Sequence, residues 1–189
     1  MLVPMRAILD AADKNGYAQG AFNVNAVCQV KAAVDVHQIL RSPAIIQGAD
    51  LANGFMGGRT DFANSTLEDK KAGAKNIGAA VKKYAADSDI PVALHLDHGK
   101  NFDSCIAAIE GGYTSVMIDG SSLPFDENVE LTREVVKYAH ERGVTVEGEL
   151  GVLAGVEDHV FAATSTYTNP LSAIDFFKKT GVDALAISY

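Results

Sequence analysis

Short apolar runs alternate with amphipathic segments along the whole chain. Six of these runs are four to six residues long and largely apolar, as strands buried on both faces of a sheet are. The pattern predicts strands at residues 21–25, 44–47, 92–97, 115–119, 145–149 and 184–188.

Helical patterns fill most of the intervals between these runs. In the segment 127–141, apolar residues recur near the 3.6-residue period of a helix. Pro170 suits a first helical turn, with Asn169 before it as the N-cap. The pattern predicts helices at residues 4–13, 26–40, 68–86, 102–110, 127–141 and 170–179.

The segment 48–67 shows no helical period and is rich in Gly, Asn and Asp. It is typical of a long loop, which is either a surface connection or a mobile segment over a site. We therefore expect no helix within it.

Regular alternation of strands and helices predicts a parallel sheet in an α/β protein. A closed TIM (β/α)8 barrel has eight strands, so six units fit either a partial TIM barrel or an open doubly wound sheet. The first strand–helix turn lacks the Gly-x-Gly-x-x-Gly pattern of a dinucleotide site. We expect a single domain over residues 1–189, a TIM barrel with about six of its eight βα units and the C-terminal units missing.

The composition restricts the kinds of partner and the cellular compartment that we expect for this protein. The chain has 189 residues and a formal net charge of −8, which disfavours nucleic acid or an anionic membrane as its partner. Cys28 and Cys105 are its two cysteines, and neither lies in a Cys-x-x-Cys pattern. With no signal peptide or transmembrane run in the pattern, we expect a cytoplasmic protein.

Polar residues follow three of the predicted strands at the point where each ends. The run at 92–96 leads into Asp97, His98 and a glycine, and the next strand leads into Asp119. Glu147 and Glu149 lie at the end of the strand after that. Carboxyl ends of parallel strands form the active sites of β/α barrels, so we expect these side chains to converge. Imidazole and carboxylate groups there suit a divalent cation or acid–base chemistry.

The turn at Gly99 should decide how the strand at 92–97 presents its last residues. Asp97 and His98 are consecutive, so a regular strand would direct them to opposite faces. Gly99 would allow a turn that brings both into one site.

Three further histidines suggest supporting or surface roles. His95 lies on the same strand face as Asp97 but deeper, so we expect a buried group that supports the site. His37 and His140 fall in helical patterns, where we expect them to be solvated.

Five segments, in this order, resemble the class II, metal-dependent fructose-bisphosphate aldolases. The most specific is the block HLDHG at 95–99, followed by MID at 117–119. The matching segments extend over nearly the whole chain and are residues 20–25, 42–47, 91–99, 112–119 and 146–151.

The resemblance implies an enzyme of glycolysis and gluconeogenesis. Its expected reaction is the reversible cleavage of fructose 1,6-bisphosphate into dihydroxyacetone phosphate and glyceraldehyde 3-phosphate. The implied cofactor is Zn²⁺, which polarises the carbonyl of dihydroxyacetone phosphate and stabilises the enediolate, with another divalent cation or a monovalent cation as alternatives. The implied partners are the sugar bisphosphate, the triose phosphates and further copies in a homodimer or homotetramer.

The resemblance also assigns metal ligands. His98 matches a zinc ligand of the family. Asp119 and Glu149 match positions associated with alternative or second-metal binding.

Catalytic and substrate-binding residues follow in the same way. Asp97 matches the acid/base that serves the C4 hydroxyl in cleavage and the aldehyde oxygen in synthesis. Glu157 matches a loop carboxylate implicated in proton transfer at the nucleophilic carbon, although its composition alone suggests a solvated acidic loop. Asn23 matches an asparagine near the substrate.

Two departures from the family pattern leave alternatives open. Ala49 occupies a position where the family often has a serine that helps bind substrate phosphate. A Gly-x-x-His-Gly segment with another zinc ligand, expected after the strand at 184–188, is not in the sequence. The alternatives are a tagatose-bisphosphate aldolase, or a truncated fragment of the aldolase that is not catalytic by itself.

Overall fold

Six parallel strands form the main sheet of the protein. The computed structural model describes residues 1–157 and 160–189, without the side chains of residues 156–161. The strand order is β1-β2-β3-β4-β5-β8, so strands consecutive in this sheet's chain order lie side by side. Each predicted strand is present within two residues of its expected ends. The bounds are β1 Ala21–Asn23, β2 Ala44–Ala49, β3 Val92–Gly99, β4 Ser115–Ile118, β5 Thr145–Leu150 and β8 Ala184–Ile187.

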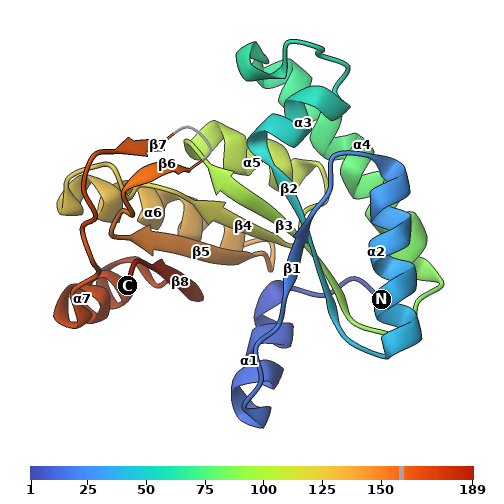
Figure 1. Ribbon diagram of the computed structural model, residues 1–189, viewed down its shortest axis with the longest axis horizontal. Helices are drawn as coiled ribbons and strands as arrows, with labels where there is room; N and C mark the ends of the chain where they lie inside the picture. The colour runs from blue at the N-terminus through green and yellow to red at the C-terminus, as the bar shows by residue number, and fades with distance from the viewer. Residues whose placement is uncertain (158–159) are drawn as a thin grey trace.

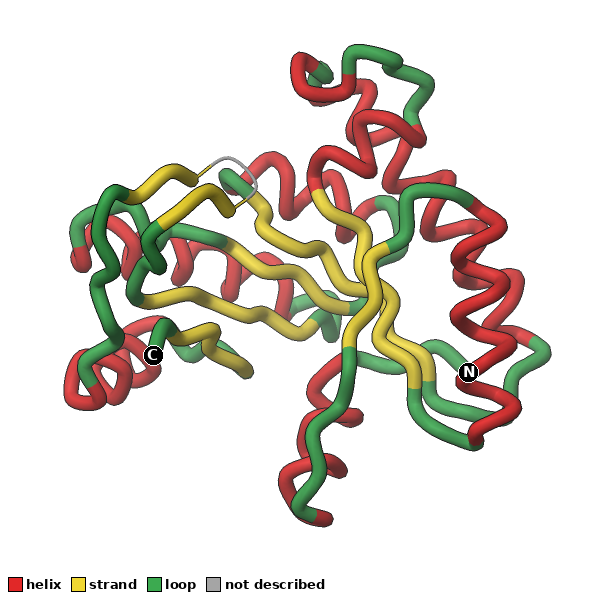
Figure 2. The backbone as a smooth tube through the Cα atoms, in the orientation of Figure 1, coloured by secondary structure: helices red, strands yellow, loops and turns green. Residues whose placement is uncertain are grey.

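The sheet curls, and helices cover its outer face (Figures 1 and 2). This arrangement is that of a partial TIM barrel, as expected from the alternating pattern. The Asn169 side chain accepts hydrogen bonds from two backbone N–H groups of the last helix, which confirms the predicted N-cap. The helices that match predicted segments are α1 Met5–Asn15, α2 Val27–Leu40, α4 Leu67–Ala86, α5 Phe102–Glu110, α6 Phe125–His140 and α7 Pro170–Thr180.

The expectation of a helix-free segment at 48–67 is wrong. It contains the helix α3 Asp50–Met56 and the short 3-10 helix η1 Phe62–Asn64. With seven residues, α3 is too short to show a period, and its formation depends on distant residues. Its buried residues include Asp50 and Asn53, which bond to side chains elsewhere in the chain.

A second, two-stranded sheet follows β5. It consists of β6 Gly155–Glu157 and β7 Val160–Ala162, which pair antiparallel. Strands of three residues leave no usable alternation in the sequence, which explains why the pattern did not predict them.

The apolar core lies between the sheet and the helices on its outer face. Ile46, Leu94, Val116 and Val146 are fully buried there, with 0% exposure. On the inner face, Met5 and Ile8 of α1 pack against β2 and β3. Because α1 covers the inner face near the amino ends of the strands, the carboxyl ends remain available for a site.

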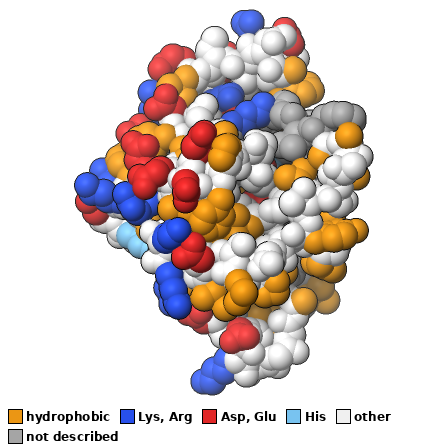
Figure 3. Space-filling view, turned by 90° about the vertical axis from the view of Figure 1, so that its left-hand side faces the viewer, with side chains coloured by type: hydrophobic (Ala, Val, Ile, Leu, Met, Phe, Trp, Pro, Cys, Tyr) orange, Lys and Arg blue, Asp and Glu red, His pale blue; other side chains and the backbone are white. Residues whose placement is uncertain are grey.

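The two edge strands differ from the centre of the sheet. All residues of β1 are exposed, and Ile187 of β8 is also exposed. The helix α7 next to β8 exposes Leu171 and Phe177. Figure 3, which shows the face on the left of Figure 1, has hydrophobic side chains grouped among charged ones. Among the described residues, no helix combines the length and apolar character needed to cross a bilayer.

Candidate functional site

The carboxyl end of β3 is irregular, and this irregularity shapes the site. Leu96 pairs with Val116 and Gly99 pairs with Ile118, so β3 has one residue more than β4 over this interval. The extra length is absorbed at His98, which has a left-handed backbone with φ 48°. A β-bulge of this kind re-aims side chains that would otherwise alternate.

The turn was expected at Gly99, but His98 makes it. Gly99 is needed for a different reason. A Cβ on this residue would lie 2.6 Å from the carbonyl oxygen of Met117 and 2.9 Å from the sulfur of Cys105. The glycine therefore permits close approach of β3 to β4, while His98 adopts the strained conformation.

As a result, Asp97 and His98 face the same cavity although they are adjacent in sequence. Both line a cavity of about 250 Å³ at the carboxyl ends of the strands. Glu147 and Glu149 of β5 line it too, together with residues of β8. The predicted convergence of polar strand ends is therefore present in the structure.

His98, Asp119 and Glu149 form a cluster of metal-ligand type. One donor atom from each lies within 4.8 Å of the others. His98 Nδ1 is 3.1 Å from Asp119 Oδ2 and 3.8 Å from Glu149 Oε2. One imidazole and two carboxylates from three strand ends are a donor set that suits Zn²⁺, and three protein ligands are typical of catalytic zinc sites.

The electrostatics of this cluster favour a positive charge among the three side chains. The hydrogen bond to Asp119 raises the pKa of His98 to about 9, and nearby carboxylates add to this effect against the opposing effect of burial. Burial alone would raise the pKa of Asp119, but hydrogen bonds from His98 and Ser121 outweigh burial and lower it. The residues therefore fit a bound cation.

Asp97 connects the cluster to the first strand of the sheet. Its Oδ2 accepts a hydrogen bond from Asn23 Nδ2 at 3.1 Å. Asn23 is the last residue of β1 and is exposed. The two residues that the resemblance relates to catalysis and substrate are thus in direct contact.

A buried network lies beneath this surface. His95 is 2% exposed, and its Nδ1 is 2.8 Å from Ser115 Oγ. Burial, helped by the charge of His98, lowers the pKa of His95 to about 3, so its ring is neutral. Its Nε2 lies 3.4 Å from Glu147 Oε2. The expectation of a buried histidine that supports the site is confirmed in its position.

Glu147 has a larger place in the site than the sequence indicated. Burial raises the pKa of Glu147 to about 7, and the charge of Asp97 adds to this rise. A carboxyl group that titrates near neutrality beside Asp97 can hold or release a proton at working pH. In the sequence, the indication that Glu147 belongs to the site was its position two residues before Glu149, on the same strand face.

The remaining expectations have mixed outcomes. His37 was expected to be solvated but is buried, with its ring 5.3 Å from that of Phe22 in an edge contact. His140 has a largely open side chain and lies 2.9 Å from Asp183. Glu157 falls on β6, and its side chain lies outside the described residues, so its predicted role stays a prediction.

With this geometry established, similarity to known proteins decides the family. A family model described as fructose-bisphosphate aldolase class-II matches residues 3–189. The chain belongs to this family. Class II aldolases are generally metal-dependent, in agreement with the His98, Asp119 and Glu149 cluster.

Individual relatives agree with this assignment. A fructose-bisphosphate aldolase of Treponema pallidum is 48% identical over 191 residues, which cover 99% of this chain and 54% of the relative. The fructose-bisphosphate aldolase of Geobacillus stearothermophilus is 41% identical, with 98% and 60% coverage. The chain therefore spans little more than half the length of these relatives.

Solved structures of aldolases share the fold. The YdjI aldolase from Escherichia coli K12 superposes with a TM-score of 0.77 at 30% identity, covering 100% of this chain and 60% of that one. Fructose-bisphosphate aldolase from Campylobacter jejuni gives a TM-score of 0.80 at 23% identity, with 100% and 59% coverage. The second match supports the fold alone.

Proposed function

We propose that the protein is a class II fructose-bisphosphate aldolase. The proposed reaction is the reversible cleavage of fructose 1,6-bisphosphate to dihydroxyacetone phosphate and glyceraldehyde 3-phosphate. The observation that carries the proposal is the bulged end of β3. It places His98 in a cluster with Asp119 and leaves Asp97 facing the same cavity in contact with Asn23.

His98, Asp119 and Glu149 are the proposed metal ligands. When bound there, a Zn²⁺ or other divalent cation supplies Lewis-acid polarisation of the ketose carbonyl. The protein's contribution is to hold the three donors on adjacent strand ends, with their charges already partly balanced by hydrogen bonds.

Asp97 is the proposed acid/base. In cleavage it accepts the proton of the C4 hydroxyl, and in synthesis it returns a proton to the aldehyde oxygen. The amide of Asn23 holds one carboxylate oxygen of Asp97 and therefore fixes its orientation. Glu157 is the proposed group for proton transfer at the nucleophilic carbon.

The setting of this reaction belongs to the proposal as well. We place it in the cytoplasm, within glycolysis and gluconeogenesis, with triose phosphates as partners and a homodimer or homotetramer as the assembly. Tagatose bisphosphate, which differs in configuration at one carbon, is the alternative substrate. The chain covers 54% and 60% of the length of two aldolase relatives, so the activity is proposed for the whole protein.

The test uses the gene product at its full natural length in a coupled cleavage assay with both ketose bisphosphates. A chelator should abolish cleavage, and added Zn²⁺ should restore it. His98→Ala should lose stoichiometric zinc and activity, whereas His140→Ala, at a histidine outside the cluster, should keep both. Borohydride treatment in the presence of substrate should not inactivate the enzyme. A trapped lysine adduct would overturn the metal mechanism.

A further inference from the structure

Asn128, a buried asparagine near the start of α6, contacts the ends of the two strands that lead to Asp119 and Glu149. It is 1% exposed. Its backbone N–H donates to the carbonyl of Pro124 at 2.9 Å, so it lies one turn into the helix. Side chains of a helix lean toward its N-terminus, and this directs the amide of Asn128 toward the ends of β4 and β5.

On the β5 side, this amide bonds to the main chain of a proposed ligand. Asn128 Nδ2 donates to the backbone carbonyl oxygen of Glu149 at 2.9 Å. Register pairing between β4 and β5 ends at Ile118 and Gly148, so Glu149 lies one residue beyond the last pair. The bond from Asn128 therefore holds the main chain of Glu149 where pairing with β4 has ended.

On the β4 side, the same amide packs against Gly120, the residue after Asp119. A Cβ on Gly120 would lie 2.3 Å from Oδ1 and 2.7 Å from Cγ of Asn128. The backbone that follows Asp119 is therefore in direct contact with the amide, with no space for a side chain between them. Asn128 thus supports the main chain at two proposed ligands at once.

The orientation of the amide is fixed by its partners. Thr132, one turn further along α6 and 0% exposed, donates from its hydroxyl to Asn128 Oδ1 at 3.1 Å. A backbone carbonyl only accepts hydrogen bonds, so the amide nitrogen must face Glu149 and the amide oxygen must face Thr132. A buried polar side chain that is bonded at both ends is held rigidly.

We propose that Asn128 is a positioning residue that sets the separation of the Asp119 and Glu149 carboxylates and thereby the affinity of the site for its cation. The inference rests on the proposed aldolase function and its metal ligands. Loss of the amide would take a donor from the Glu149 carbonyl and allow the two strand ends to shift relative to each other. Metal–ligand distances tolerate deviations of only about 0.2 Å, so a small shift weakens binding.

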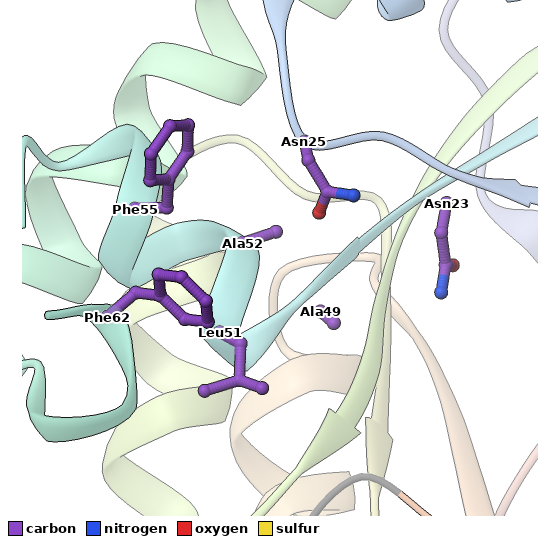
Figure 4. Close-up of a pocket in the computed structure, with 7 residues that line it drawn as sticks. All are labelled: Asn23, Asn25, Ala49, Leu51, Ala52, Phe55 and Phe62. Carbon is purple, nitrogen blue, oxygen red and sulfur yellow. The ribbon is translucent and has the colours of Figure 1, made fainter. Parts of the chain in front are cut away.

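Asn53 provides a matched comparison near β1 and β2. It is 2% exposed, lies in α3 and accepts a 2.7 Å hydrogen bond from the hydroxyl of Tyr113. The helix α3 forms one wall of a second cavity, of about 450 Å³, and lines it with apolar side chains such as Leu51 and Phe55 (Figure 4). Tyr113 precedes β4, at the opposite end of that strand from Asp119. Replacing Asn53 therefore removes a buried amide at a distance from the proposed ligands.

The test measures zinc affinity of the full-length gene product by competition with a chromogenic chelator, beside urea denaturation of the metal-free protein. Asn128→Ala should raise the zinc dissociation constant by about 10- to 100-fold, as loss of groups that hold metal ligands does. Asn53→Ala should lower the urea midpoint by a comparable amount and leave the zinc dissociation constant unchanged.

Bound Co²⁺ gives a second readout that does not depend on activity. Its visible absorption bands respond to the geometry of the donor set. Asn128→Ala should shift these bands, because the carboxylates change their separation. Asn53→Ala should keep the wild-type spectrum.

Gly120 allows the contact to be altered from the opposite side. The methyl group introduced by Gly120→Ala would collide with the Asn128 amide and should weaken zinc binding. In the double variant Gly120→Ala/Asn128→Ala, the methyl group meets only the Cβ of residue 128, at 3.3 Å, and fills part of the space left by the amide. The stability losses of the two single variants should therefore sum to more than the loss in the double variant. Zinc affinity should stay low, because the bond to Glu149 is still absent.

These measurements separate the inference from the proposed function. If the wild-type protein neither binds zinc stoichiometrically nor cleaves a ketose bisphosphate, the proposed function fails. If it does both, and Asn128→Ala keeps the wild-type zinc dissociation constant and Co²⁺ spectrum, the positioning inference is overturned. It is also overturned if Asn53→Ala weakens zinc binding as much as Asn128→Ala does. If Asn128→Ala does not fold, Asn128→Ser, which keeps a shorter donor, takes its place in the same two measurements with the same criteria.

Discussion

Two sides of the sheet, compared at the carboxyl ends of the strands, differ in where their charged side chains lie. On the side of β3, β4 and β5, the ionisable groups face the cavity, and Glu147 and His98 have shifted pKa values. On the side of β1, β2 and α3, apolar groups face the cavity. The ion pair of that side, Asp50 with Lys70, lies behind the wall.

This difference separates two tasks. Proton transfer and metal binding need partly buried ionisable groups whose protonation states respond to each other. On the second side, the buried ion pair of Asp50 with Lys70 links the short helix α3 to α4. Substitutions on the first side should therefore affect rate and metal content, and those on the second side should affect stability.

Asp97→Asn should have the largest effect and tests the first task. The asparagine keeps the size of the side chain but cannot accept the proton, so the cleavage rate should fall by roughly 10²–10⁴-fold. Zinc content should be unchanged. A coupled assay and metal analysis of the full-length protein measure both. Asp13→Asn, at an exposed position on α1, is the control. Full activity in Asp97→Asn would contradict the assignment.

Lys70→Met tests the anchor on the second side. The Asp50 and Lys70 side chains are 5% and 18% exposed, so the substitution leaves a carboxylate buried without its cation. The free energy of unfolding should fall by about 3–5 kcal/mol, as for other broken buried pairs. Urea denaturation measures this.

A matched pair of variants makes the anchor test specific. Lys71→Met, at the neighbouring and more open lysine, should cost no more than about 1 kcal/mol. The double variant Asp50→Asn/Lys70→Met should recover part of the loss, because no charge remains buried. Equal costs for the two single lysine variants would show that the pair does not anchor α3.

His95→Gln tests the buried network through pH. The pKa of His95 is lowered to about 3 in the fold, against 6.5 for a free imidazole. The unfolded chain therefore binds more protons between these values. The stability that neutral His95 contributes is present above pH 6.5 and is lost as the pH falls toward 3.

Replacing His95 should make the free energy of unfolding fall less steeply as the pH is lowered. The difference in slope between wild type and His95→Gln should reach at most about 1.4 kcal/mol per pH unit. Urea unfolding at pH 7, 6 and 5 measures it, with His140→Gln as the control. Parallel curves for wild type and His95→Gln would mean that His95 does not titrate as described.

Substitutions at two helix N-caps, one on each side, should have the smallest effects on stability and allow a direct comparison of the two sides. Thr66 caps α4 on the α3 side in a capping box with Asp69, and Asn101 caps α5 directly after β3. Thr66→Ala and Asn101→Ala should each cost about 1 kcal/mol of stability. Asn101→Ala should lower the cleavage rate more, because it loosens the end of β3. The opposite order of rates would argue against the division of tasks.

The sequence was sufficient for features that depend on local pattern. The strands were recognisable because short apolar runs alternate with amphipathic segments, and the Asn169 cap because its side chain bonds within its own turn. Convergence of Asp97, His98, Asp119 and Glu149 followed from parallel strand topology. Their assignment to a metal site and an acid/base depended on the family resemblance.

Features set by distant contacts were not recognisable. The helix α3 is held by Lys70 and Tyr113, which are far from it in the chain. His37 is buried, and its ring contacts that of Phe22 from β1, a contact that the helical pattern around His37 does not indicate. The raised pKa of Glu147 arises from burial and from Asp97, which the strand pattern cannot measure.

The bulge in β3 has a consequence for engineering and for variation in chain length. Along a regular strand, side chains alternate between the two faces of the sheet. In β3, one additional residue between Leu96 and Gly99 interrupts this alternation. A deletion of one codon in this interval would restore an ordinary strand and turn the His98 imidazole away from Asp119. Transfer of this site to another barrel therefore requires both β3 and β4 with their mismatch in length, since the HLDHG letters alone do not specify the direction of either functional side chain.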